Sequence, residues 1–136
     1  MRDDTTNESK RPIDPDVFAS KWIDEWNRRD IEALVSHYTP DARFISPVAA
    51  KRTGSSVVIG REALVAYWSG ARQYRKFVFT FESLAWDPVR MVLVIVYRRQ
   101  VDDRNDRAVE TFHFNPDGLV RAGEAMYGAA DISIES

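Results

Sequence analysis

Cysteine is absent from the 136 residues of this chain. Its absence excludes disulfide bonds, thiol nucleophiles and thiolate metal sites. Histidine is scarce, because His37 and His113 are the only two, and neither has a His, Asp or Glu neighbour at the spacing of metal ligands. The sequence also has no glycine pattern that could cradle a phosphate. We therefore expect neither a metal nor an organic cofactor.

Long apolar runs and charge of one sign are missing too. The longest apolar stretch, residues 91–97, has the length of a strand and falls short of the roughly 18 residues that a membrane helix needs. The first dozen residues contain no apolar signal-peptide core, which predicts a cytoplasmic protein. The net charge is −2 and no basic block is present, so neither nucleic acid nor a membrane is expected as a partner.

Aromatic residues, by contrast, are abundant. Four Trp, five Tyr and seven Phe make up 12% of the chain, and many of them fall on segments that should face inward. Two interpretations fit this composition equally well. The aromatic side chains can form a large solid core, or they can line a cavity for an apolar ligand.

The N-terminal half of the chain has the pattern of helices. Residues 14–16 (Asp-Pro-Asp) form a helix start, with an acidic cap and a proline in the first turn. Apolar residues then recur at three- and four-residue spacing as far as Trp26, which is typical of an amphipathic helix. Asp30 can cap a second, shorter helix, and we expect residues 39–41 (Thr-Pro-Asp) to close it, because proline disfavours the helical conformation at the residue before it.

A short strand, a loop and a third helix are expected next. Residues 42–46 have the pattern of a strand that Pro47 ends. Residues 49–56 are mostly small or basic, which predicts a loop. The third helix begins after Gly60 and has apolar residues spaced to face the core.

From Lys76 onward the pattern changes to that of strands. The β-rich segments are residues 77–82, 89–101, 109–114 and 119–127, and polar turns are expected at 87–88, 102–107 and 115–118. Helices followed by strands joined by hairpins predict an α+β fold, with the helices packed on one face of a curved antiparallel sheet. We expect a single domain over residues 14–130, between a disordered N-terminal tail at 1–13 and a C-terminal tail at 131–136.

Glu110 is the titratable residue of greatest interest. It shares a strand face with Phe112 and Phe114, because side chains two residues apart point the same way. Burial on that apolar face would raise the pKa of the carboxyl and keep it neutral at about pH 7, so that it could donate a hydrogen bond to a developing oxyanion. The alternative is that Glu110 reaches solvent or pairs with Arg98 or Arg99.

For the remaining polar residues that could take part in catalysis or binding, we expect structural roles. His113 falls on the opposite face from Glu110, where a surface or subunit-interface position is expected. His37 is placed to interact with the negative end of the second helix. Asp24 and Glu25 are most simply explained as solvated helix charges.

A family resemblance is carried by three segments: residues 29–48 (RDIEALVSHYTPDARFISPV), 59–68 (IGREALVAYW) and 109–118 (VETFHFNPDG). They resemble the corresponding segments of ketosteroid isomerases and SnoaL-like proteins of the nuclear transport factor 2-like superfamily. The similarity extends over residues 15–127. It implies a cone-shaped, cystatin-like α+β fold with three helices on the concave face of the sheet, a deep pocket between helices and sheet, and a homodimer formed through the sheet.

The resemblance also implies functional positions, and several of them are changed in this chain. The general base, an Asp just before a proline in the isomerases, is Ser46 here. The oxyanion-hole Tyr of the first helix falls at Trp22 and the supporting Tyr of the third helix falls at Trp68, whereas the oxyanion-hole acid falls at Glu110. General-base catalysis is worth roughly 10²–10⁴-fold in rate, so steroid isomerisation by the family's own mechanism is not expected.

Ser46 itself has no obvious base beside it, and a serine without a base is a poor nucleophile. We expect its hydroxyl to satisfy local backbone groups before Pro47. Epoxide hydrolysis, which the fold also supports, needs an Asp-Arg-Asp set around a water that the sequence does not locate.

Two hypotheses for function follow. In the first, the chain is a SnoaL-like domain that binds a small, largely apolar molecule, with Glu110 and Ser46 as polar anchors; any catalysis would be that of an isomerase, cyclase or lyase acting next to a carbonyl without a cofactor. The expected pocket residues are Trp22, Trp26, Phe44, Trp68, Phe112 and Phe114. In the second, the chain is a non-catalytic binding or dimerisation module whose own aromatics fill the pocket. A cavity of several hundred Å³ beside Glu110 favours the first hypothesis, and a Trp22–Trp68 contact that closes it favours the second.

Overall fold

The first two helices begin where the sequence places their caps. The structure, a computed structural model, describes residues 13–130. Helix α2 (Pro15–Arg28) is capped by Asp14, whose side chain accepts hydrogen bonds from two backbone N–H groups of the first turn. Helix α3 (Ile31–Ser36) is capped in the same way by Asp30. It is shorter than expected, because strand β1 (Tyr38–Ile45) already begins two residues after it ends.

The segment between β1 and the next strand corrects the expectation of a loop over residues 49–56. It forms helix α4 (Pro47–Thr53), whose N-cap is Ser46 and whose C-cap is Gly54 in the left-handed region at φ 84°. A serine cap, a proline in the first turn and a glycine cap are helix signals that outweigh the small and basic composition. Strand β2 (Val57–Ile59), helix α5 (Arg61–Trp68) and a 3₁₀ turn, η1 (Ser69–Gln73), complete this half of the fold.

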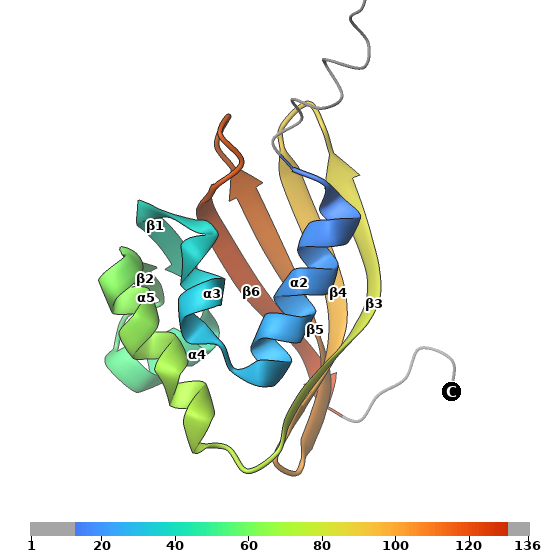
Figure 1. Ribbon diagram of the computed structural model, residues 1–136. Helices are drawn as coiled ribbons and strands as arrows, with labels where there is room; N and C mark the ends of the chain where they lie inside the picture. The colour runs from blue at the N-terminus through green and yellow to red at the C-terminus, as the bar shows by residue number, and fades with distance from the viewer. Residues whose placement is uncertain (1–12, 131–136) are drawn as a thin grey trace, which may run out of the picture.

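Four long strands form most of the sheet: β3 (Phe77–Asp87), β4 (Val92–Val101), β5 (Arg104–Phe114) and β6 (Val120–Ala130). The six strands lie in the order β2-β1-β6-β5-β4-β3 (Figure 1). The α+β prediction is confirmed, but the sheet is mixed, because β1 runs parallel to β6 while the other neighbours are antiparallel. β1 and β6 are joined through most of the chain and not by a hairpin, so a parallel pairing is possible.

The turn between β4 and β5 is tighter than the expected polar turn over residues 102–107. Val101 pairs with Arg104, so only Asp102 and Asp103 lie in the turn. β5 continues through the polar residues because Asp106 is buried on the inner face, where its carboxylate accepts hydrogen bonds from Arg99 at 2.9 and 3.1 Å.

Helices α2, α3 and α5 cover the concave face of the curled sheet, with β3 curving around α2 (Figure 1). Between α2 and the sheet lies a cluster of edge-to-face aromatic rings. Trp22 contacts Tyr97 and Phe112 at centroid distances of 5.0 and 5.3 Å, and Phe18 contacts Phe112 and Phe114 at 5.1 and 5.2 Å. Such pairs contribute about 0.5–1.5 kcal/mol each beyond the burial of their area.

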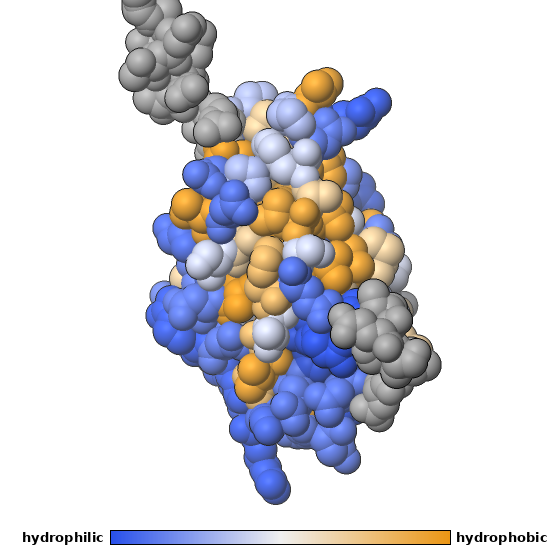
Figure 2. All heavy atoms as spheres, turned by 90° about the vertical axis from the view of Figure 1, so that its right-hand side faces the viewer, coloured by the Kyte–Doolittle hydropathy of each residue, from blue (hydrophilic) through white to orange (hydrophobic). Residues whose placement is uncertain are grey.

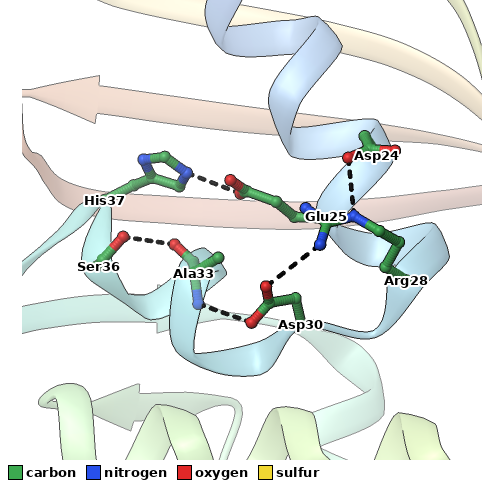
Figure 3. A network of polar contacts seen from close by, with 7 residues as sticks. All are labelled: Asp24, Glu25, Arg28, Asp30, Ala33, Ser36 and His37. Atoms are coloured by element: carbon green, nitrogen blue, oxygen red, sulfur yellow. Dashed lines mark hydrogen bonds and ion pairs between the residues drawn. The ribbon is translucent and has the colours of Figure 1, made fainter.

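Glu25 is not the solvated helix charge that its position in α2 suggested. Its side chain is buried and its Oε1 lies 2.7 Å from Nε2 of His37, the residue that follows α3 (Figure 3). Asp24, the adjacent residue, does form an exposed pair with Arg28 in the next turn of α2. The Glu25–His37 pair therefore joins α2 to the start of β1.

The expected tails lie outside the described residues, apart from Ile13, which is buried against the core. Among residues 13–130, no helix combines the length and the apolar character that crossing a membrane requires. The same residues contain no group of three His, Asp or Glu side chains placed to hold a metal ion.

Candidate functional site

A cavity of about 290 Å³ lies between α2, α4, α5 and the sheet. Its volume is near the lower end of the range of ligand pockets, which is about 300–1,000 Å³. Aromatic side chains form most of its wall: Trp26, Phe44, Tyr67, Trp68, Tyr74, Phe77, Phe79, Tyr97 and Tyr127. Exposed residues of α4 and of the β4–β5 turn lie at its mouth.

Three of the six expected pocket aromatics line the cavity, namely Trp26, Phe44 and Trp68. The other three, Trp22, Phe112 and Phe114, belong to the solid aromatic core next to it. On β5, each step of two residues moves about 7 Å along the strand, so Phe112 and Phe114 lie progressively further from the cavity than Glu110. The aromatic side chains thus form a solid core in one part of the inner face and line a cavity in another.

Glu110 lies in the cavity wall, as its strand face predicted. Only 3% of the residue is exposed, and its Oε1 accepts a hydrogen bond from the Tyr97 hydroxyl at 3.2 Å. Burial raises the pKa of the carboxyl to about 8, against the smaller opposing effects of the Tyr97 hydrogen bond and of the positive charge of Arg99. Glu110 is therefore mostly protonated at neutral pH and can donate a hydrogen bond into the cavity.

The predicted alternative, an ion pair between Glu110 and a neighbouring arginine, is not formed. Arg99 makes its two hydrogen bonds to Asp106 and lies over the Tyr127 ring at 4.1 Å. Arg98 is on the other face of β4, where its Nη1 lies 3.8 Å from a carboxylate oxygen of Glu82.

Phenol groups surround Glu110. Burial, followed by the negative charge of Glu110, raises the pKa of Tyr38 and Tyr97 well above the ordinary value and that of Tyr127 to about 12. These phenols therefore stay neutral across the physiological range. The hydroxyl of Tyr38 is buried with no hydrogen-bond partner among the described residues, whereas that of Tyr97 donates to Glu110.

Ser46 is fully buried at the junction of β1 and α4 and is not part of the cavity wall. Its hydroxyl accepts a hydrogen bond from the backbone N–H of Val48 at 3.1 Å and lies 3.3 Å from the Tyr67 hydroxyl. The expected local backbone role is thus confirmed. Ser46, for which the resemblance implies the position of the isomerase base, provides a helix cap in this chain.

Two important cavity residues, Tyr97 and Arg52, were missed by the sequence interpretation. Ile95 is directly opposite Glu110 in the β4–β5 register, which places Tyr97 one step along the same face. If the turn is placed at residues 102–103, counting back along both strands gives this register from the sequence alone. Arg52 was missed because it lies in α4, where a loop was expected.

The model of the SnoaL-like domain family matches residues 19–123. Among solved structures, a SnoaL-like protein from Burkholderia thailandensis E264 is 30% identical with a TM-score of 0.76, and the match covers 85% of this chain and 94% of that one. No curated protein matches the chain.

Two further structures share the fold at lower identity. The epoxide hydrolase/cyclase-like enzyme SalBIII, described in pyran ring formation in the polyether salinomycin, is 16% identical with a TM-score of 0.66, over 94% of this chain and 95% of that one. A steroid delta-isomerase from Pseudomonas aeruginosa is 20% identical with a TM-score of 0.66, over 85% and 80%.

Proposed function

Because the chain belongs to the SnoaL-like domain family, we propose that it binds a small, largely apolar molecule whose carbonyl oxygen accepts a hydrogen bond from Glu110. The observation that carries this proposal is a buried carboxyl with a pKa of about 8 in the wall of an aromatic cavity. A largely aromatic cavity with a buried carboxyl in its wall favours a ligand that is apolar and has a hydrogen-bond acceptor. Trp22 packs on Phe112 and Tyr97 and leaves the cavity open, which argues against a pocket filled by its own aromatics.

Catalysis next to that carbonyl is the second candidate function. A hydrogen bond from a neutral acid strengthens as negative charge develops on the oxygen, which assists isomerase, cyclase and lyase reactions alike. Two proteins of the same fold, the delta-isomerase and SalBIII, have names that fit this class, although fold alone does not fix a reaction.

For such a reaction Glu110 can serve as the general acid, but a general base is less evident. Ser46 cannot take up a proton at physiological pH, and Asp102, a carboxylate at the mouth, already accepts hydrogen bonds from the backbone N–H groups of Arg75 and Lys76. Asp103 lies in the same exposed turn at the mouth, so Glu110 is the buried carboxyl available for proton transfer inside the cavity. We therefore propose binding as the primary function, and any turnover should be lost in Glu110→Gln.

Paired ligands test the proposed hydrogen bond. The probes are 2-acetylnaphthalene and 2-isopropenylnaphthalene, which have nearly the same shape but only one of which has a carbonyl oxygen. Isothermal titration calorimetry should show about tenfold tighter binding of the ketone at about pH 6 and loss of that preference in Glu110→Leu. The control is Thr111→Val, on the opposite face of β5.

Equal affinity for the two probes, or a ketone preference that survives in Glu110→Leu, would contradict the assignment of Glu110. The preference should also decline between about pH 7 and pH 9, because the ionised carboxylate cannot donate.

We also propose a homodimer formed through the outer face of the sheet. The strand register brings Val96, Val109 and Met126 side by side across β4, β5 and β6. Met126 is exposed, as is Val78 of β3, whereas Val96 and Val109 are half-buried. Figure 2 shows apolar side chains gathered in a band on the side of the molecule where β3 lies. Apolar side chains gathered across neighbouring strands are typical of protein interfaces.

A further inference from the structure

Two cationic side chains at the mouth of the cavity have no ion-pair partner among the described residues, although the carboxylates of the β4–β5 turn lie at the same mouth. Four cationic side chains line the cavity: Lys51, Arg52, Arg99 and Arg104. Arg99 is paired with Asp106, and Arg104 lies 3.9 Å from the same carboxylate. Lys51 and Arg52, in the last turn of α4, have no ion pair within residues 13–130.

Arg52 is held in place without being neutralised. Its guanidinium lies over the rings of Tyr67 and Tyr74, at 5.8 Å from each centroid, and donates a hydrogen bond to the Tyr74 hydroxyl. Gly70 leaves room for it, because a Cβ at that position would come within 2.3 Å of Nη1 of Arg52. A guanidinium stacked on aromatic rings keeps donors for a further acceptor and has lost part of its conformational freedom in advance.

The aromatic wall of the cavity extends from Arg52 at the mouth to Glu110 in the interior. Tyr67 contributes to the cavity, and its ring lies beneath Arg52. The pKa of Tyr67 is raised mainly by burial, is lowered by the charge of Arg52 and is raised by that of Glu110, so its phenol is within electrostatic range of both. Arg52 and Glu110 both line this one cavity, so a ligand that fills it can contact both groups.

From this geometry we infer that the ligand is an amphipathic carboxylate: an aromatic or apolar acid whose carboxylate binds Arg52 at the mouth while a ketone oxygen reaches Glu110 inside. This inference rests on the proposed function and names its ligand class. Carboxylates suit a guanidinium, which offers them two parallel N–H donors. Lys51, in the adjacent position of α4, adds a positive charge that favours association with anions.

A matched pair of probes tests this inference. The first is 6-acetyl-2-naphthoic acid, and the second is its primary amide, which keeps the shape and the ketone but has no charge. We expect the wild-type protein to bind the acid about tenfold more tightly than the amide by isothermal titration calorimetry at about pH 6.5. Arg52→Gln should remove most of this preference and leave the affinity for the amide within about twofold.

Arg72→Gln is the control, because it removes the same charge from an exposed position of η1 outside the cavity wall. It should keep the wild-type preference, and circular dichroism should show all variants folded. Higher salt should reduce the preference for the acid in the wild type.

The outcomes separate this inference from the function on which it rests. If both probes bind and their affinity depends on Glu110, but acid and amide bind equally or the preference survives in Arg52→Gln, the inferred ligand class is wrong and the proposed function stands. If neither probe binds, the proposed function fails and the inference fails with it.

Discussion

At the scale of single residues, Glu110 makes the stability of the fold depend on pH in the opposite sense to that of a salt-bridged carboxylate. The pKa of its carboxyl is about 8 in the folded protein against 4.5 in its ordinary state. When the pH lies between these two values, Glu110 is protonated in the folded state and ionised in the unfolded state. The stabilising contribution is thus complete below about pH 4.5 and is lost as the pH rises through about 8.

Urea unfolding of the wild type and of Glu110→Gln should reveal this contribution. Gln keeps the size of the side chain and does not titrate. The free energy of unfolding of the wild type should fall relative to that of the variant by about 1.4 kcal/mol per pH unit between about pH 5 and pH 8, and should level off above. Parallel pH profiles for the two proteins would show that the pKa of Glu110 is not raised.

Tyr38 provides a second residue-level prediction. Its hydroxyl is fully buried and has no hydrogen-bond partner among the described residues. Tyr38→Phe should therefore stabilise the protein by about 1 kcal/mol in urea unfolding, because an unsatisfied buried hydroxyl is removed. Tyr97→Phe is the matched control and should be destabilising, since it leaves Glu110 without its donor. A loss of stability in Tyr38→Phe would indicate a partner for this hydroxyl.

At the scale of elements, the sequence predicted helix starts that depend on neighbouring residues. It did not predict contacts between residues of different elements. Asp14 and Asp30 predicted the starts of α2 and α3 because a cap acts on the turn beside it. The signals of α4, its caps Ser46 and Gly54, are also local, but the small and basic residues between them are typical of a loop. Glu25 was misjudged for another reason: its partner follows a different helix, and no helical periodicity reveals that contact.

The Glu25–His37 pair should stabilise the packing of α2 against α3 and β1. A double-mutant cycle with Glu25→Gln and His37→Leu should give a coupling free energy of about 1–3 kcal/mol, because both side chains are largely buried and 2.7 Å apart. The Asp24–Arg28 pair, also shown in Figure 3, is the control. Its atoms are 2.9 Å apart but exposed, so the same cycle there should give about 0.5 kcal/mol or less. Equal coupling in the two cycles would mean that burial does not strengthen the inner pair.

At the scale of the whole molecule, the layout of the fold was predictable and the shape of the cavity was not. Helices followed by alternating segments, together with the family resemblance, predicted the α+β layout. The alternation in β5 also placed Glu110 on the inner face. Whether Phe44 or Phe112 lines the cavity depends on how far each lies from α4 and α5, and those distances arise only when non-adjacent elements pack. Arg52 required the correct assignment of α4 as well.

The proposed dimer gives a prediction at this scale. Multi-angle light scattering after size exclusion should give twice the chain mass of 15.6 kDa for the wild type. Val109→Glu, in the middle of the outer face, should yield a monomer, because a charge buried in an apolar interface is costly. Val17→Glu changes an exposed valine of α2 in the same way and should leave the mass unchanged. A wild-type mass of a single chain would contradict the proposed interface.

A ¹³C NMR titration of the Glu110 carboxyl carbon would show whether this residue is a neutral hydrogen-bond donor in a ligand cavity. The signal is assigned by its absence in Glu110→Gln. We predict a midpoint near pH 8 in the free protein and a higher midpoint with 2-acetylnaphthalene bound, because a ketone oxygen that accepts a hydrogen bond from the carboxyl stabilises the neutral acid. A midpoint near the ordinary value of 4.5, or one that the ketone does not raise, would contradict this role of Glu110.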